Sequence, residues 1–216
     1  MVNEHFYKEI ITTLQPSQTT LVAVSKLKPV SDIEQLYALG QRDFGENYVQ
    51  ELVEKQPQLP ADIRWHFIGH LQSNKVKYIA PFVTIIQSVD SIKLLTEINK
   101  QAIKNNRTIA CLLQVHIAEE QTKFGFNAAE LQQLQPETFT HIDFAGVMGM
   151  ATFTDDKQKV EREFQHLKSI FDDFKLHHTL PHFNTISMGM SDDYALAIQC
   201  GSNMVRIGSL LFGKRG

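Results

Sequence analysis

Short apolar runs recur along the chain, each followed by a stretch with helical spacing, and this alternation limits the fold more than any other feature. Eight runs occur, at residues 20–25, 43–45, 65–69, 84–89, 110–117, 144–148, 185–188 and 205–208. Several are almost continuously apolar, which is typical of strands buried on both faces of a parallel sheet. Strands that alternate with helices in this way predict β-α-β units.

Eight such units are the number that closes a (β/α)8 barrel. We therefore predict an α/β fold, a TIM barrel formed by one domain over residues 1–216, for which the chain is long enough. A doubly wound open sheet has the same alternation and stays as the alternative, because a sequence pattern does not reveal closure. The residues before Thr20 predict an extra N-terminal helix that covers the bottom of the barrel.

Two short motifs and one periodic segment predict where particular helices begin and end. The sequence SDIE at residues 31–34 predicts a capping box for a helix that ends near Gly40. The sequence NAAE at residues 127–130 predicts a similar start. Apolar side chains at helical spacing predict a long amphipathic helix over residues 156–178.

Composition argues against several classes of function. The formal net charge of −3 gives no basic footprint for nucleic acid or an anionic membrane, and no run reaches the roughly 18 apolar residues of a membrane helix. Cys111 and Cys200 form no CxxC pair and suit a reducing cytosol, and the polar N-terminus lacks a signal peptide. His66 and His70 are four residues apart, but their segment is predicted to be a strand that runs into a loop. The geometry of a helical metal-binding pair is therefore missing, and we expect no metal site. A cytoplasmic protein is the expectation.

Active sites of (β/α)8 barrels lie at the C-terminal ends of the strands, so the polar residues just after each run are the candidates. Lys26 directly follows the first run, where partial desolvation would favour the neutral amine that attacks an aldehyde. Lys28 has the same strand parity and is an equal candidate, and either could be a surface lysine. Asn47 follows the second run and could donate to a ligand oxygen or cap the next helix.

The segments around the seventh and eighth runs predict a phosphate site, because barrels often bind phosphate with the loops after these two strands. Gly189 lets the backbone approach a ligand, and serine hydroxyls and N–H groups near a helix start suit a phosphate dianion. Arg206 lies within the eighth run. A buried arginine needs an acceptor, which could be an acidic side chain or a ring nitrogen.

Six blocks of sequence, taken in chain order, resemble the pyridoxal phosphate homeostasis protein family. They are AVSK (23–26), FGENYVQE (44–51), WHFIGHLQSNK (65–75), FAGVMGM (144–150), SMGMSDD (187–193) and VRIGSLLFG (205–213). Together they extend over almost the whole chain. Members of this family resemble the N-terminal barrel of alanine racemase.

The resemblance implies that pyridoxal 5'-phosphate (PLP) is the cofactor and that it is bound covalently at Lys26, which settles the tie with Lys28. The remaining implied contacts are Asn47 beside the ring, Ser187 with the backbone of Gly208 and Ser209 at the phosphate, and Arg206 at the pyridine nitrogen. An arginine at that nitrogen stays protonated and disfavours protonation of the ring. The ring is then a weaker electron sink, so the resemblance implies storage of PLP rather than turnover.

We therefore predict a monomeric protein of intracellular PLP homeostasis that stores, buffers and delivers the cofactor to PLP-dependent apo-enzymes, without catalytic residues. Two alternatives stay open. The first is an amino-acid racemase of the alanine racemase type with Lys26 as one base; we find no second base, and with the chain ending at Gly216 we expect no second domain to supply a tyrosine. The second is a barrel that binds another phosphate ester.

Overall fold

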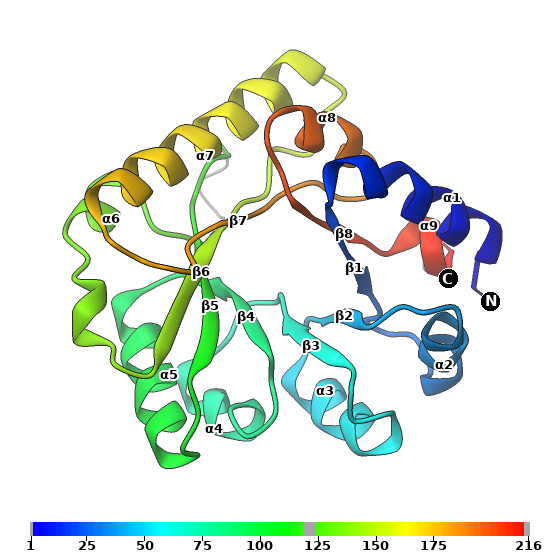
Figure 1. The fold of residues 1–216 in the computed structure, drawn as a ribbon, viewed down its shortest axis with the longest axis horizontal. Coiled ribbons are helices and arrows are strands. Elements are labelled where there is room, and N and C mark those ends of the chain that lie inside the picture. Colours follow the sequence, from blue (N-terminus) through cyan, green and yellow to red (C-terminus); the bar gives the residue numbers. More distant parts are fainter. Residues whose placement is uncertain (1, 119–123, 214–216) are drawn as a thin grey trace.

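Parallel strands form a closed barrel in the computed structural model, which describes residues 2–118 and 124–213 (Figure 1). The strands are β1 (Thr20–Val24), β2 (Asp43–Glu46), β3 (Arg64–Phe67), β4 (Ile85–Val89), β5 (Ile109–Gln114), β6 (Ile142–Met148), β7 (Thr185–Ser187) and β8 (Met204–Ile207). Each strand pairs in parallel with its neighbours in sequence, and β8 closes the ring by pairing with β1. The predicted barrel is confirmed, and the open-sheet alternative is wrong.

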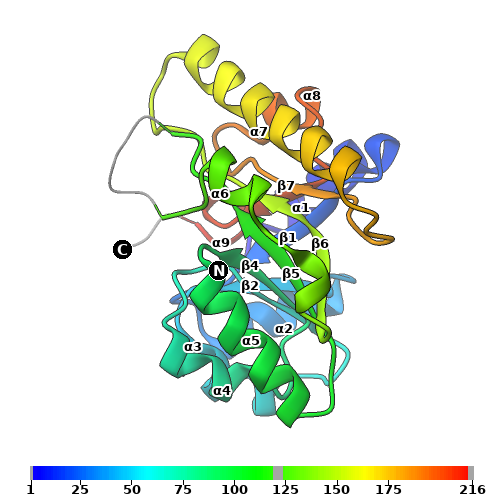
Figure 2. The ribbon, with the colours of Figure 1, turned by 90° about the vertical axis from the view of Figure 1, so that its left-hand side faces the viewer.

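Helices surround the ring of strands (Figure 1; Figure 2). They are α1 (Glu4–Leu14), α2 (Val30–Ala38), α3 (Val49–Lys55), α4 (Val76–Ile79), α5 (Ile92–Lys104), α6 (Ala128–Gln132), α7 (Lys157–His177), α8 (Tyr194–Gln199) and α9 (Ser209–Phe212). Short 3-10 turns are η1 (Gln15–Ser17), η2 (Gln56–Gln58), η3 (Ser73–Lys75) and η4 (Pro136–Thr138). Among the described residues, no helix is long and apolar enough to cross a membrane.

The helix boundaries confirm two of the three sequence expectations. Asn127 and Glu130 form the predicted capping box at the start of α6, and α7 runs from its cap at Asp156 along the predicted length. The predicted capping box at residues 31–34 is wrong. Helix α2 already begins at Val30, because Pro29 has the fixed φ of −67° that suits the residue before a helix, and no side chain caps it.

Helix α1 belongs to the outer ring rather than to the bottom of the barrel, where the sequence placed it. It packs against β1 and α9, and the backbone N–H of Asn3 donates to the carbonyl of Leu211 at 2.7 Å. Figure 1 shows α1 between α8 and α2, outside β1 and β8. The segment after β8 forms only the short α9, so the outer wall there is covered by α1, through its buried Tyr7, Ile10 and Leu14.

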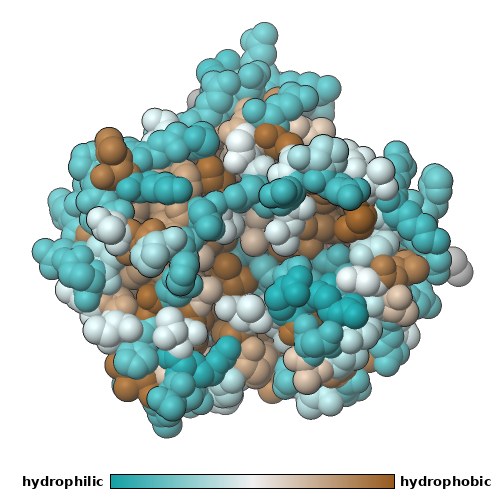
Figure 3. Space-filling model, in the orientation of Figure 1, coloured by the Kyte–Doolittle hydropathy of each residue, from teal (hydrophilic) through white to brown (hydrophobic). Residues whose placement is uncertain are grey.

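Strand alternation gives the barrel two separate apolar cores. On β1, Leu21 and Ala23 face the large core between strands and helices, whereas Val22 faces the interior of the barrel. The buried members of the interior cluster are Val22, Ile85, Leu112, Met148 and Met204. On the surface, hydrophilic side chains cover much of the periphery, with apolar ones between them (Figure 3).

Candidate functional site

Lys26 lies two residues beyond the C-terminal end of β1 and is partly buried. Val22 faces the barrel interior, so the two-residue period of the strand, continued past its end, assigns Lys26 to the interior side. Ser25, with the opposite parity, directs its hydroxyl to Glu46 at 2.6 Å. The position of Lys26 at the barrel mouth is the one that the sequence predicts.

Lys28 does not share this orientation, because the strand period ends before it. Leu27 has a positive φ of 60°, and the N–H of Lys28 donates to the carbonyl of Ser25 at 3.1 Å to close a turn. The Lys28 ammonium donates to the carbonyl of Phe212 at 2.9 Å. Lys28 therefore ties the turn after β1 to the end of α9.

A group of charged side chains on the outer side of β1 and β2 holds the turn that carries Lys26; we call Glu46, Glu51 and Lys55 the outer clamp. The Lys55 ammonium donates to Glu46 at 2.8 Å and to Glu51 at 2.6 Å. It also donates to the carbonyl of Ser25 at 2.9 Å. The carboxylate of Glu51 accepts the N–H of Leu27 at 2.6 Å. The backbone is therefore fixed immediately before and after Lys26.

Glu46 and Lys55 of the outer clamp are buried and Glu51 is partly buried, so the stability of the clamp depends on charge balance. Burial raises the pKa of the Glu46 carboxyl, and the nearby Lys55 ammonium opposes that rise. Removing one member of a buried ion pair typically costs about 3–5 kcal/mol, because the partner is left charged and unpaired. Sequence reasoning missed Lys55, since a lysine on a helix gives no signal until the fold brings it against β1.

Asn47 follows β2, and the oxygen of its side-chain amide has no hydrogen-bond partner among the described residues. This Oδ1 atom is buried. The proposed capping role is wrong, because α3 begins after Tyr48 and has no side-chain cap. Gly69 approaches the same backbone so closely that a Cβ there would lie 2.2 Å from the Asn47 carbonyl oxygen. Such a buried amide oxygen at the barrel mouth suits a ligand with polar atoms.

Arg206 is buried at the C-terminal ends of the last strands. Its guanidinium donates to the carbonyl and hydroxyl of Ser187 at 2.8 and 2.7 Å and to the carbonyl of Gly149 at 3.0 Å. Burial lowers the pKa of Arg206 to about 10, against the opposing charge of Asp193. It is therefore a cation at neutral pH that keeps further N–H groups for another acceptor.

The Ser187 hydroxyl forms hydrogen bonds within the protein, whereas the resemblance implies a contact with the phosphate. The residue is fully buried, and its hydroxyl donates to Gln87 at 2.6 Å while accepting from Arg206. Both uses of the hydroxyl are therefore internal to the barrel. These contacts make Ser187 a support for Arg206, and the sequence missed this because Gln87 lies 100 residues away.

Gly208 and Ser209 lie where β8 passes into α9. Gly208 precedes the helix, and a Cβ at this position would lie 3.3 Å from the Val24 carbonyl oxygen, close to the turn of Lys26. The first N–H groups of a helix, including that of Ser209, have no acceptor within the helix. The predicted site residues on β1, β2, β7 and β8 are thus all at the same end of the barrel.

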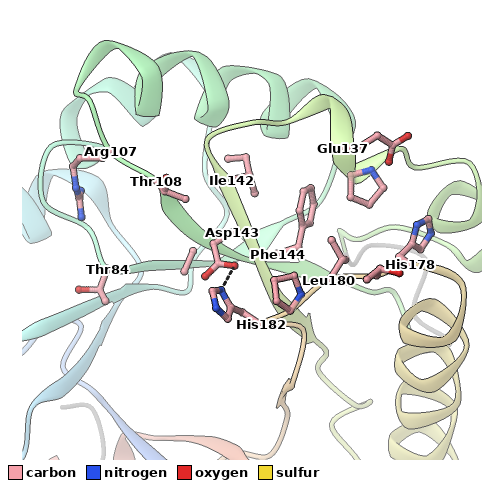
Figure 4. A pocket seen from close by; sticks show the side chains of 14 residues that line it. Thr84, Arg107, Thr108, Glu137, Ile142, Asp143, Phe144, His178, Leu180 and His182 are labelled. Carbon is pink, nitrogen blue, oxygen red and sulfur yellow. Dashed lines mark hydrogen bonds and ion pairs between the residues drawn. The ribbon is translucent and has the colours of Figure 1, made fainter.

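A cavity of about 780 Å³ lies at the other end of the barrel and contains none of the predicted site residues (Figure 4). Thr84 and Thr108, which line it, directly precede β4 and β5. His182 contacts Asp143 at 3.0 Å, whereas Arg107 donates to backbone carbonyls. Within the described ranges no group of three or more His, Cys, Asp or Glu side chains could hold a metal ion.

Comparison with known sequences gives a consistent family. Residues 4–216 match the family model described as alanine racemase, N-terminal domain. A pyridoxal phosphate homeostasis protein from Pasteurella multocida is 42% identical over 206 residues, which cover 92% of this chain and 88% of that protein.

Solved structures show the same fold. PipY from Synechococcus elongatus PCC7942, solved with PLP bound, is 31% identical with a TM-score of 0.86, over 95% of this chain and 99% of that one. The same protein without PLP has a TM-score of 0.89. Alanine racemase from Clostridium difficile 630 is 15% identical with a TM-score of 0.77 and is covered over 56% of its length, which is a likeness of fold alone.

Proposed function

The chain belongs to the pyridoxal phosphate homeostasis protein family, and we propose that it binds PLP as an imine of Lys26 and serves to store, buffer and deliver the cofactor in the cytoplasm. The amine nitrogen of Lys26 attacks the aldehyde carbon of PLP, and water leaves. The observation that carries the proposal is the position of Lys26 at the mouth of the barrel, at the same end as the buried cation of Arg206.

The family resemblance assigns the remaining site residues to the cofactor, and their chemistry suits these roles. Asn47, whose buried Oδ1 has no partner among the described residues, would lie beside the ring. The N–H groups of Gly208 and Ser209, at the start of α9, hold the phosphate. Ser187, whose hydroxyl bonds to Gln87 and Arg206, acts through the position that it gives to Arg206 at the ring nitrogen.

Arg206 supports storage rather than turnover. Its hydrogen bonds within the described residues go to neutral acceptors, so a further N–H can be donated to the pyridine nitrogen. A guanidinium that remains charged at neutral pH disfavours a proton on that nitrogen, and an unprotonated ring stabilises a carbanion weakly. The relatives named for homeostasis and the PLP-bound PipY structure support the same function.

The alternative of a racemase is supported by the match of residues 4–216 to the family model described as alanine racemase, N-terminal domain, and by the barrel shared with the solved alanine racemase. At 15% identity this likeness concerns the fold, which hosts many activities. A barrel that binds another phosphate ester has support only from the N–H groups at the start of α9.

The proposal is tested by the visible absorption of the purified protein after addition of PLP. We expect an imine band in the wild type and in Lys28→Ala, and its loss in Lys26→Ala. Incubation with L-alanine and a chiral assay should show no sustained turnover. A band that survives Lys26→Ala would overturn the imine assignment, and sustained racemisation would overturn the storage function.

A further inference from the structure

Five side chains form a hydrogen-bonded series across the interior of the barrel, which we call the inner chain. Arg206 donates to the Ser187 hydroxyl at 2.7 Å, and Ser187 donates to Gln87 Oε1 at 2.6 Å. Gln87 Nε2 lies 2.8 Å from His66 Nδ1, and His66 Nε2 lies 3.0 Å from Asp43 Oδ1. The series begins at the proposed cofactor site and reaches β2, and all five residues are buried.

The donor and acceptor capacities of the five groups favour one direction for each hydrogen bond. A guanidinium only donates, so the Ser187 oxygen accepts and the hydroxyl proton goes to Gln87 Oε1. Gln87 then presents its NH₂ group to His66, whose Nδ1 must accept. The proton of His66 is therefore on Nε2, where it is donated to the Asp43 carboxylate.

The opposite orientation of the Gln87 amide is disfavoured. It would direct an N–H at the Ser187 oxygen, which already accepts from Arg206, and the hydroxyl proton would lose its acceptor. A buried donor without a partner costs about 1–3 kcal/mol. The orientation with Nε2 toward His66 also brings that NH₂ group to 3.3 Å from the Met204 sulfur, a weak acceptor.

We propose that Gln87 and His66 are positioning residues that hold the Arg206 guanidinium in the orientation in which it meets the ring nitrogen of PLP. Gln87 accepts the hydroxyl proton of Ser187, so a lone pair of the Ser187 oxygen faces Arg206. His66 accepts from the NH₂ group of Gln87 and so sets the orientation of that amide, and Asp43 fixes the tautomer of His66. The inference rests on the proposed function for the identity of the ring, but the order of Arg206 itself does not depend on PLP.

The first test compares Gln87→Met, which keeps the length of the side chain and removes both hydrogen bonds, with Gln101→Met. Gln101 is also buried but lies on α5 and bonds to Glu97, outside the inner chain. We expect Gln87→Met to weaken PLP binding about tenfold, equivalent to one lost hydrogen bond, and to shift the absorption band of bound PLP. Gln101→Met should change neither.

A second pair of variants separates positioning from packing at residue 66. His66→Asn retains an amide oxygen near the place of Nδ1 and can still accept from Gln87, whereas His66→Leu cannot. We expect His66→Asn to recover most of the PLP affinity and the wild-type band position, and His66→Leu to resemble Gln87→Met. This pair decides the question if Gln87→Met fails to fold.

Crystal structures of ligand-free wild type and Gln87→Met test the inference without reference to PLP. We expect the Arg206 guanidinium to leave the Ser187 hydroxyl or to occupy several conformations in the variant. An unchanged, fully ordered Arg206 together with unchanged PLP affinity and spectrum would overturn the inference. Failure of wild-type protein to form the Lys26 imine would instead overturn the proposed function, and the ordering of Arg206 would still be decided by these two structures.

Discussion

Side chains on the two faces of β2 belong to two different polar networks. Asp43 belongs to the inner chain, and Glu46, three residues later and therefore on the opposite face of the strand, belongs to the outer clamp. The outer clamp consists of charged groups and fixes the backbone beside Lys26. The inner chain consists largely of neutral groups and fixes the side chain of Arg206.

The difference shows how one barrel can orient two groups at the same mouth by different means. A charged network is sensitive to the loss of any one partner, because a buried charge without its counter-charge is strongly unfavourable. A neutral series loses about one net hydrogen bond for each missing member. We therefore expect substitutions in the outer clamp to affect stability most, and substitutions in the inner chain to affect mainly the orientation of Arg206.

The largest expected effect is that of Lys55→Met. It leaves the buried carboxylate of Glu46 and the partly buried carboxylate of Glu51 without their common ammonium, so the free energy of unfolding should fall by about 3–5 kcal/mol. Urea denaturation measures this loss. Lys100→Met, whose side chain is 73% exposed and 3.9 Å from Glu97, should change the value by less than about 1 kcal/mol. Equal effects of the two substitutions would remove the distinction between a buried clamp and a surface pair.

A smaller loss is expected for Asp43→Asn, which neutralises the end of the inner chain. Burial acts to raise the pKa of Asp43, but the hydrogen bonds from His66 and Arg64, together with the charge of the Arg64 guanidinium, outweigh it and lower the pKa below 3.8. Replacement weakens charge-assisted hydrogen bonds, so unfolding at neutral pH should become easier by about 1.5–3 kcal/mol.

The pH dependence of the free energy of unfolding shows whether the charge of Asp43 stabilises the fold. Because the folded-state pKa of Asp43 is lowered, its contribution is fully present above the unfolded pKa of 3.8 and is lost as pH falls through the folded value. Denaturation at several pH values should therefore show a shallower acid decline in Asp43→Asn than in the wild type. Asp62→Asn is the control, since Asp62 also has a lowered pKa but is exposed, and its decline should barely change. Parallel declines for wild type and Asp43→Asn would count against a charged end of the inner chain.

The smallest expected effect is that of Ser88→Ala, next to Gln87 on β4. The Ser88 hydroxyl is buried without a hydrogen-bond partner in the described part of the chain, so its removal should leave the free energy of unfolding within about 0.5 kcal/mol or raise it slightly. Thermal and urea unfolding beside Gln87→Met measure the contrast between neighbouring residues of one strand. If Ser88→Ala lowered the free energy of unfolding as much as Gln87→Met, the effect of Gln87→Met could not be attributed to the hydrogen bonds of Gln87.

The fold was accessible from sequence because it depends on local patterns. The apolar runs mark every strand, and residues 127–130 and 156–178 mark two helices by caps and spacing. The place of α1 was not accessible, because it depends on how little chain follows β8 to cover the wall.

The residues of the candidate site also include some that local sequence patterns indicate and some that depend on the closed fold. The local pattern made Lys26 and Lys28 equal candidates, and the family resemblance selected Lys26. Asn47 and Arg206 were candidates because a strand end or a strand interior is a local feature. The partners Lys55 and Gln87 were missed, since each contacts its site only through closure of the barrel. The resemblance gives Ser187 a role at the phosphate, and its hydrogen bonds to Gln87 and Arg206 were not predicted because these partners come from other strands.

The covalent bond to PLP can be located by reducing the PLP-loaded protein with borohydride, which makes an imine permanent, and mapping the modified peptide by mass spectrometry. We predict modification of Lys26, with Lys28 unmodified because its ammonium is bound to the Phe212 carbonyl. Modification of Lys28 instead, or of no lysine at the barrel mouth, would contradict the central claim that the turn after β1 presents Lys26 to the cofactor.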